Sequence, residues 1–174
     1  MRSQLLFLAA IALPGAAMGA QVKKGEIAGV GNFSRVNATV GCAGATDPSA
    51  MTLLRKEGFV SVINLRQAQE QGADIAGSRA AAQSAGLKYI HLPFDAAAPD
   101  PKVVESFLAA VADKTNQPAF IHCGSANRVG AVWMIKRALQ DGWPIEKARA
   151  EAETIGLRSP ELVTFATGYI NARR

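Results

Sequence analysis

The sequence has no apolar run long enough to cross a bilayer, no cluster of basic residues, no repeats and no low-complexity tract. A membrane-spanning helix needs ~20 consecutive apolar residues, and the apolar run from Leu5 to Leu13 is far shorter. The 19 Lys and Arg residues are scattered rather than striped, which disfavours nucleic-acid binding. No His, Cys, Asp and Glu residues have metal-ligand spacing. We therefore expect no membrane span, no nucleic-acid partner, no metal and no cofactor.

The chain also has little cysteine, and its N-terminus indicates where the two thiols would reside. Residues 1–20 combine Arg2, the short apolar run and a stretch of mostly small residues, which together are typical of a secretory signal peptide. Cleavage after Ala20 would leave residues 21–174 as one domain in the periplasm or outside the cell. In that oxidising compartment Cys42 and Cys123 could form a disulfide, or could be a working thiol and a bystander.

Charge adds a weak indication of the ligand. The whole chain has a formal charge of +5, and loss of the leader with its single Arg lowers it to about +4. This modest surplus suits an anionic substrate.

Beyond residue 20, short β-rich segments alternate with helical patterns, which is the organisation of a layered α/β domain. Two segments predict a short hairpin, Phe33–Val36 and Thr39–Cys42. Further strands are expected at Phe59–Leu65, Leu87–Leu92 and Ala119–His122. Helices are expected from Asp47 and Pro48 to Gly58, over 74–85, from Asp100 and Pro101, over 127–139, and at two C-terminal segments of which Ser159 and Pro160 open the second.

The chemistry is concentrated where the last of these strands meets the helix at 127–139. The junction reads Cys123-Gly-Ser-Ala-Asn-Arg128, directly after His122. A loop in this position aims backbone N–H groups and the positive end of a helix dipole at one point, which makes an anion site. The same field lowers the pKa of a thiol at its mouth. Arg128 adds a fixed charge and a bidentate fork for phosphate or sulfate oxygens.

A plainer interpretation of the same residues is available. Cysteine is commonly a small buried residue, and an arginine at a helix start is often only a solvated charge. However, His122, Cys123 and Arg128 occur together here, and the intervening residues Gly124, Ser125 and Ala126 are small enough for close ligand approach. The combination favours a loop that binds and attacks a tetrahedral anion.

The segment His122-Cys-Gly-Ser-Ala-Asn-Arg-Val-Gly130 resembles the loop of bacterial dual-specificity-phosphatase-like proteins, once called domain of unknown function 442. These proteins are relatives of the phosphatase-like part of β-lactamase hydrolase-like proteins. Similar segments occur at Phe33–Cys42, Gly58–Arg66, His91–Asp95 and Gly142–Ala152. The resemblance covers nearly all of residues 21–174. It implies an α/β fold of the cysteine-phosphatase kind, with a central, mostly parallel sheet flanked by helices.

The resemblance also implies roles for individual residues in cleaving a phosphate monoester, such as a phosphotyrosine or phosphoserine protein. Cys123 would be the nucleophile that forms a phosphocysteine, and His122 would orient the loop. Arg128 and the loop residues Gly124, Ser125, Ala126 and Asn127 would bind the phosphate. Independently of the resemblance, Arg66 ends a strand at the ligand-binding edge of the sheet, where it would either add positive potential or be an ordinary surface charge.

Three features depart from the resembled pattern. Many cysteine phosphatases place five residues between Cys and Arg, whereas here there are four, and Val129 stands where many have Ser or Thr. The third is the general acid that protonates the leaving oxygen. Where the donor often sits, this chain has Ala96, so Asp95 is the first candidate, with a turn residue as its alternative. Asp100 is the second candidate, since it also suits a helix N-cap.

Two other functions remain open at this stage. Rhodanese-type sulfurtransferases use a six-residue loop opened by Cys, and the segment Cys123 to Arg128 has that length. In that case Cys123 would carry a persulfide and no general acid would be needed. Alternatively, the domain would only bind phosphate or an acidic segment without catalysis. A reversible disulfide between Cys42 and Cys123 is a further hypothesis, because Cys42 lies in a segment that leads toward the same edge in the resembled family.

Overall fold

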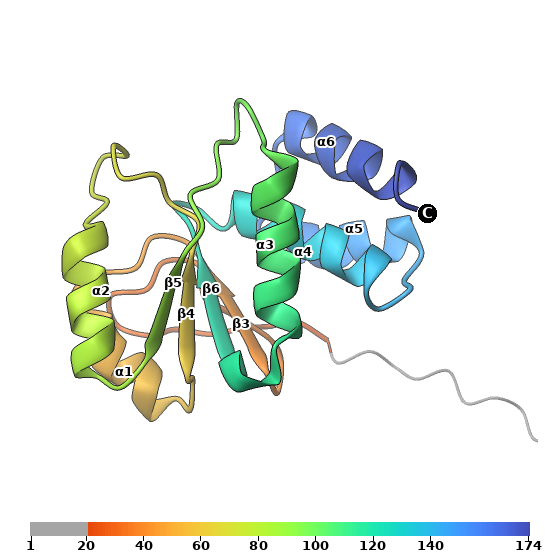
Figure 1. Cartoon of the computed structure of the whole chain (residues 1–174). Coiled ribbons are helices and arrows are strands. Elements are labelled where there is room, and N and C mark those ends of the chain that lie inside the picture. The colour runs from red at the N-terminus through yellow and green to blue at the C-terminus, as the bar shows by residue number, and fades with distance from the viewer. Residues whose placement is uncertain (1–20) are drawn as a thin grey trace, which may run out of the picture.

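The computed structural model describes residues 21–174, so the predicted signal peptide at residues 1–20 lies outside the described residues. Its centre is a six-stranded sheet with the order β1-β2-β3-β6-β4-β5 (Figure 1). The strands are β1 (Lys23–Lys24), β2 (Ser34–Asn37), β3 (Val40–Ala43), β4 (Ser61–Asn64), β5 (Lys88–His91) and β6 (Ala119–His122). The neighbouring strands β3, β6, β4 and β5 run parallel, whereas the pairs β1–β2 and β2–β3 are antiparallel. The expected mostly parallel sheet is therefore confirmed.

Six α-helices cover the two faces of the sheet (Figure 1). They are α1 (Met51–Lys56), α2 (Ile75–Ser84), α3 (Pro101–Ala112), α4 (Asn127–Leu139), α5 (Ile145–Ile155) and α6 (Pro160–Asn171), with short 3-10 turns at Pro48–Ala50 and Lys114–Asn116. Residues of α1 and α2 form one apolar core with one face of the sheet, and residues of α3 to α6 form a larger core with the other. Because both faces are covered, the central strands β4 and β6 are buried along their whole length, as parallel strands usually are.

Helix starts follow the local signals in the sequence with one exception. The side chains of Asp74, Asp100 and Ser159 each accept a hydrogen bond from a backbone amide in the first turn of α2, α3 and α6. Asp47 makes no such bond. The residues after it first form the 3-10 turn Pro48–Ala50, so α1 begins only at Met51, later than the Asp-Pro pair predicts.

Helix α4 lies in the centre of the larger core, as its apolar composition predicts. Trp133 is fully buried within it. Gly130 permits a close approach to the chain after α5, because a Cβ there would come within 2.8 Å of the Leu157 Cβ and 2.9 Å of the Ala152 carbonyl oxygen. This contact fixes the first turn of α4, and with it the loop that precedes the helix. Within residues 21–174, no helix has the length and apolar character needed to cross a membrane.

Candidate active site

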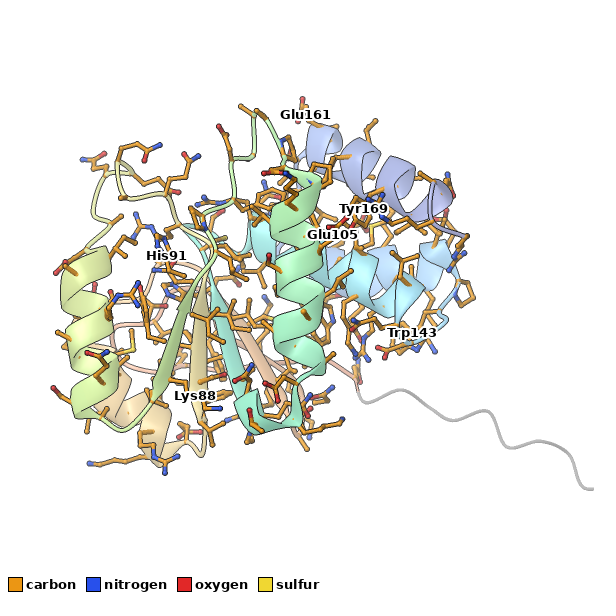
Figure 2. All side chains as sticks on the ribbon, viewed as in Figure 1. Lys88, His91, Glu105, Trp143, Glu161 and Tyr169 are labelled. Carbon is orange, nitrogen blue, oxygen red and sulfur yellow. The ribbon has the colours of Figure 1, made fainter. Side chains whose placement is uncertain are left out.

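The predicted anion loop lies at the carboxyl edge of the parallel strands. In Figure 2, Lys88 and His91 mark the two ends of β5, and the carboxyl ends of its parallel neighbours lie at the His91 side. Cys123 follows β6 directly, and α4 begins at Asn127, so the loop spans the strand-to-helix junction. Open α/β sheets bind ligands at this edge, because the loops after parallel strands meet there.

The backbone of the loop leaves a run of amides without partners. The amide of Cys123 donates to the Ala43 carbonyl oxygen (3.3 Å), and the amide of Gly130 donates to the Ala126 carbonyl oxygen (2.9 Å). Between them, no amide from Gly124 to Val129 has a hydrogen-bond acceptor within residues 21–174. Buried or semi-buried amides are normally paired, so an unpaired run at a helix N-terminus indicates a site for an anion.

Carbonyl groups of the same loop accept hydrogen bonds from neighbouring segments, which hold the loop in place. The Gly124 oxygen accepts from the Ala45 amide (3.0 Å), and the Ser125 oxygen accepts from the Asn32 Nδ2 (3.2 Å). Ala126 has φ +74°, a left-handed conformation that costs energy for any residue with a Cβ. Gly156 packs on it so closely that a Cβ there would come within 2.9 Å of the Ala126 Cβ. The surrounding structure therefore imposes the loop conformation.

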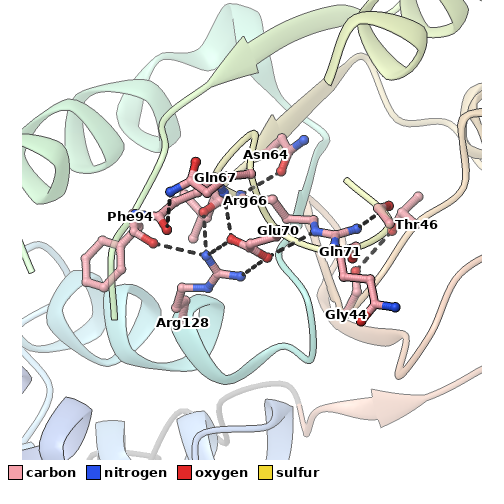
Figure 3. A network of polar contacts seen from close by, with 12 residues as sticks. Gly44, Thr46, Asn64, Arg66, Gln67, Glu70, Gln71, Phe94 and Arg128 are labelled. Carbon is pink, nitrogen blue, oxygen red and sulfur yellow. Dashed lines mark hydrogen bonds and ion pairs between the residues drawn. The ribbon is translucent and has the colours of Figure 1, made fainter. Parts of the chain in front are cut away.

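Arg128 is held by one edge of its guanidinium group, as Figure 3 shows. Its Nη1 donates to the carbonyl oxygens of Leu65 (3.1 Å) and Phe94 (3.0 Å), and Nη1 and Nη2 together donate to the two carboxylate oxygens of Glu70. The Nε–H and the second Nη2 hydrogen have no oxygen acceptor within the described residues, and the guanidinium lies beside the Cys123 thiol. These two donors are parallel, so the free edge can bind two oxygens of one anion.

Electrostatics favour the charged form of this arginine. Burial alone would lower the pKa of Arg128, but the hydrogen bond to Glu70 and the charge of Cys123 raise it above its ordinary value. Arg128 therefore keeps its positive charge beside Cys123.

Glu70 is the functional residue that the sequence does not reveal. Besides Arg128, its carboxylate accepts from Arg66 Nε (3.2 Å) and from the Gln67 amide (2.7 Å). Burial would raise the pKa of this carboxyl, but the hydrogen bonds from Arg128 and Gln67 lower it to about 2, so it is ionised at neutral pH. Glu70 lies in the segment between β4 and α2, which has no motif and is far from Arg128 in sequence, so no local signal marks it.

Arg66 builds this segment rather than pointing at an anion. It is only 7% exposed, so the expectation of an ordinary surface charge is wrong. Its Nη1 and Nη2 donate to the carbonyl oxygens of Gly72 (2.9 Å) and Gln71 (2.7 Å), while its Nε binds Glu70. These contacts fold the segment so that Glu70 faces Arg128.

His122 lies beneath the loop as a neutral ring. Burial lowers its pKa to about 3, with a further contribution from the charge of Arg66. Backbone groups of Gly44 and Cys123 lie near the ring, but neither ring nitrogen makes a regular hydrogen bond within the described part of the chain. The ring packs against Phe120 with centroids 5.8 Å apart. If His122 orients the loop, it does so by packing.

The two candidate acids differ in their surroundings. The Phe94 carbonyl oxygen accepts a hydrogen bond from Arg128. The backbone of Asp95, the next residue, therefore lies close to the arginine. Asp95 Oδ1 accepts from the Ala97 amide (2.9 Å), a turn contact that leaves Oδ2 without a partner within residues 21–174. Asp100 instead caps α3 through the Lys102 amide (2.8 Å). Both carboxylates keep Oδ2 without a partner within residues 21–174, so Asp95 is favoured by its position next to Phe94, whose carbonyl oxygen binds Arg128.

Asn127 and the two cysteines complete the description of the predicted site residues. Asn127 Oδ1 accepts from the amides of Arg158 (2.8 Å) and Ser159 (3.2 Å), so its side-chain oxygen ties α4 to the α5–α6 connection, while its backbone amide belongs to the unpaired run. Cys123 is fully buried in this structure, and both cysteines are free thiols. Within the described ranges, no group of three or more His, Cys, Asp and Glu side chains could hold a metal ion.

Solved structures place this architecture among the cysteine-dependent phosphatases. A DUF442 protein from Shewanella putrefaciens CN-32 is 22% identical, with a TM-score of 0.72, covering 83% of this chain and 94% of that one. TpbA from P. aeruginosa is 21% identical (TM-score 0.68, 90% and 92% covered). The catalytic domain of the PP-IP phosphatase SIW14 from S. cerevisiae is 18% identical (TM-score 0.69, 85% and 93%). The fold is thus that of cysteine-dependent phosphatases of the dual-specificity type.

The family follows from the sequence itself. Residues 32–140 match the family described as beta-lactamase hydrolase-like protein, phosphatase-like domain, and the chain belongs to that family. No curated protein matches the chain at a significant level. The resemblance inferred from the loop is confirmed, and it favours the phosphatase-like group over the sulfurtransferase alternative.

Proposed function

We propose that the protein hydrolyses phosphate monoesters, with Cys123 as nucleophile. The observation that carries this proposal is the run of unpaired amides from Gly124 to Val129 beside the free edge of the Arg128 guanidinium. Together these donors suit a group with several oxygens and more than one negative charge, which describes a phosphoryl group in transfer.

Two steps follow from this placement. The Cys123 thiolate attacks phosphorus, the bond from phosphorus to the ester oxygen breaks, and Asp95 gives its proton to the leaving alcohol. The Asp95 carboxylate then takes a proton from a water molecule as that water attacks the phosphocysteine. Inorganic phosphate leaves and the thiolate is restored. Because Val129 has no hydroxyl to stabilise the departing thiolate, we expect the second step to limit turnover.

Because Cys123 is fully buried, the ester reaches sulfur only after neighbouring groups move. A Cβ at Gly124 would lie 3.4 Å from Arg128 Nη2 and 3.5 Å from Glu70 Oε2, so these side chains flank the loop. The segment that carries Glu70 is partly exposed at Gln69, Gln71 and Gly72. We expect this segment to shift when the ester enters.

A phosphotyrosine or phosphoserine protein is the proposed substrate class. In support, a Cys-to-Ser variant of TpbA has been crystallised in complex with pTyr. A largely apolar groove of about 540 Å³ lies between the Asp95 segment and the start of α6. Its walls include Ala96, Ala97, Pro99, Pro160 and Phe165. Glu161 marks its position at the start of α6 in Figure 2. Such a groove suits the apolar part of a peptide next to the phosphorylated residue.

Export to the periplasm or the medium is also a proposal, and it rests on the composition of residues 1–20. The N-terminal sequence of the protein recovered from its native compartment tests it. A protein that begins at Gln21 supports export with cleavage after Ala20, whereas cytoplasmic protein that retains Met1 contradicts it.

The activity is tested by assaying purified protein side by side with an aryl phosphate and with thiosulfate. We expect release of phosphate from the first and no sulfur transfer from the second. Cys123→Ser should abolish turnover but retain phosphate binding, and Cys42→Ser is the matched control that should retain turnover. Sulfur transfer dependent on Cys123 would establish the sulfurtransferase instead. Phosphate binding without turnover of any ester would establish a binding module.

A further inference from the structure

Two cationic side chains lie beside the phosphate loop, outside the contacts that hold Arg128. They are Lys24 in β1 and Arg158 in the connection between α5 and α6, and both are exposed. The sequence separates them widely, and neither belongs to the loop motif. Only the tertiary structure brings both residues next to the loop.

Lys24 is fixed to the loop through one intermediate residue. Its Nζ donates to Asn32 Oδ1 (2.7 Å) and to the Ile155 carbonyl oxygen (3.2 Å). The Asn32 Nδ2 in turn donates to the carbonyl oxygen of Ser125 within the loop (3.2 Å). Both acceptors of Lys24 are neutral, so its positive charge is anchored but not compensated, and one of its three donors remains free.

Arg158 is attached to the other end of the loop through its backbone. Its amide donates to Asn127 Oδ1 (2.8 Å), which places its Cα at the start of α4. Within residues 21–174, the Arg158 guanidinium makes no hydrogen bond or ion pair, and only the backbone amide of this residue has a partner. The nearest acid in sequence, Glu161, is instead bound by the Ser159 hydroxyl (2.6 Å).

The two charges are close enough to repel each other. Partial burial lowers the pKa of Lys24, and the charge of Arg158 lowers it further. By contrast, Arg66 and Arg128 share the carboxylate of Glu70. Folding that holds two like charges together without a counter-charge has a cost, and an anion placed between them relieves it.

We propose that Lys24 and Arg158 form a second anion subsite, which binds a second acidic group of the substrate while the loop holds the phosphate to be cleaved. This proposal rests on the proposed phosphatase function and narrows its substrates. The preferred ones are phosphopeptides with a carboxylate or a second phosphate close to the scissile phosphate. Because both cations are exposed, the subsite contributes to selectivity more than to chemistry.

Three phosphotyrosine peptides test the subsite, identical except that the flanking residues are glutamine, glutamate or phosphoserine. We expect wild-type protein to show kcat/KM about 3- to 10-fold higher with the acidic flanks than with glutamine, as for partly screened charge pairs. Added salt should reduce this preference because both cations are solvent-exposed. Comparison of the glutamate and phosphoserine arms shows whether a carboxylate suffices or a second phosphate is required.

Arg158→Gln and Lys24→Gln should each reduce the preference toward unity. Arg158→Gln is the cleaner variant, since the lost guanidinium makes no contact within the described residues. The matched control is Lys114→Gln, which removes an exposed cation before β6, at the opposite end of that strand from the loop. It should retain the full preference. Equal kcat/KM for all three peptides in wild type, or an unchanged preference in Arg158→Gln, overturns the proposal.

The experiment also separates this proposal from the proposed function. If no peptide is hydrolysed and an aryl phosphate is also left intact, the phosphatase function fails. Peptide affinities of the Cys123→Ser protein, measured by calorimetry, then test the subsite alone. A preference for acidic flanks that Arg158→Gln removes supports the subsite in that case, and its absence contradicts it.

Discussion

Helix α4 carries two arginines near its opposite ends, and they do different work. Arg128 in the first turn and Arg137 in the last turn each form a partly buried ion pair with a glutamate. Arg137 donates from Nε and Nη2 to Glu151 and from Nη1 to Asp141 (2.9 Å). Its guanidinium also stacks against the rings of Trp133 (4.9 Å) and Trp143 (4.3 Å).

The difference between the two lies in what is left unused. Every nitrogen of the Arg137 guanidinium binds a carboxylate, and aromatic rings flank it. Arg128 keeps a free edge beside a row of unpaired amides. An arginine paired at every nitrogen stabilises the fold, whereas one held by a single edge can bind a ligand with the other. The same residue type on the same helix is thus paired at every nitrogen at one end and left with a free edge at the other.

The largest expected effect comes from truncating each arginine in turn. Arg128→Ala should lower kcat/KM for an aryl phosphate by about 10²- to 10³-fold, because it removes the charge that holds the transferring oxyanion. Arg137→Ala should instead lower stability by about 3 kcal/mol, because it leaves the largely buried Glu151 carboxylate without its cationic partner, with the Trp133 Nε1 donor remaining. Steady-state kinetics and chemical denaturation check the pair. Loss of activity without destabilisation in Arg137→Ala would contradict the distinction.

Asp95 sharpens the comparison, since it directly follows the residue whose carbonyl oxygen holds Arg128. Asp95→Asn should slow hydrolysis of alkyl esters by about 10²-fold and that of aryl esters with good leaving groups far less, because only the former need a proton. Asp100→Asn is the control, and it should affect both ester types equally. Equal slowing of both by Asp95→Asn would point to another acid.

The partner glutamates offer a smaller but more direct contrast. Glu70→Gln keeps the shape but removes the charge that orients Arg128, and we expect about a 10-fold loss in kcat/KM. Glu70→Asp should recover part of that loss if orientation is the cause. Glu151→Gln should reduce stability and leave kcat/KM of the folded protein unchanged.

Glu70 also links this contrast to pH. Its pKa is about 2 in the folded protein against an ordinary value of 4.5, so its contribution to stability is complete above pH 4.5. That contribution is lost as pH falls from 4.5 toward 2, because the unfolded chain binds the proton first. Denaturation midpoints measured across this range should fall less steeply in Glu70→Gln than in wild type. Parallel curves for the two proteins would show that folding does not lower the pKa of the Glu70 carboxyl.

The smallest expected effect concerns Cys42, whose thiol lies near Cys123 at the start of α4 and near Glu151, the partner of Arg137 at its end. It lies on β3 opposite Ile121, on the same face of the sheet as Cys123. Burial raises the pKa of its thiol, and the charges of Glu151 and Cys123 raise it further. Mild peroxide should oxidise Cys123 to a sulfenate, which Cys42 traps as a disulfide with loss of water, slowly because little Cys42 thiolate is present. Non-reducing mass spectrometry that shows only free or over-oxidised thiols would exclude this.

The sequence was sufficient for the parts of the fold that local chemistry dictates. The β-branched run before Arg66 became the buried strand β4, and the Asp-Pro and Ser-Pro pairs opened α3 and α6. The junction from His122 to Arg128 was recognisable because the residues of a phosphate loop are contiguous. Asp47 misled because a helix start also depends on how the preceding segment packs, and here that packing favours a 3-10 turn.

The residue patterns by themselves therefore determined the layered α/β organisation, the order of its helices and the anion loop after β6, and the family resemblance implied the mostly parallel sheet. Only the tertiary structure decided that Glu70 holds Arg128 by one edge, that Arg66 folds the segment behind it, and that Lys24 and Arg158 both lie beside the loop. The physical reason is the range of the interactions. Helix caps, turns and strand propensity depend on residues a few positions apart, so they can be predicted from the sequence. Ion pairs join residues that only folding brings together, and their partners have no fixed spacing.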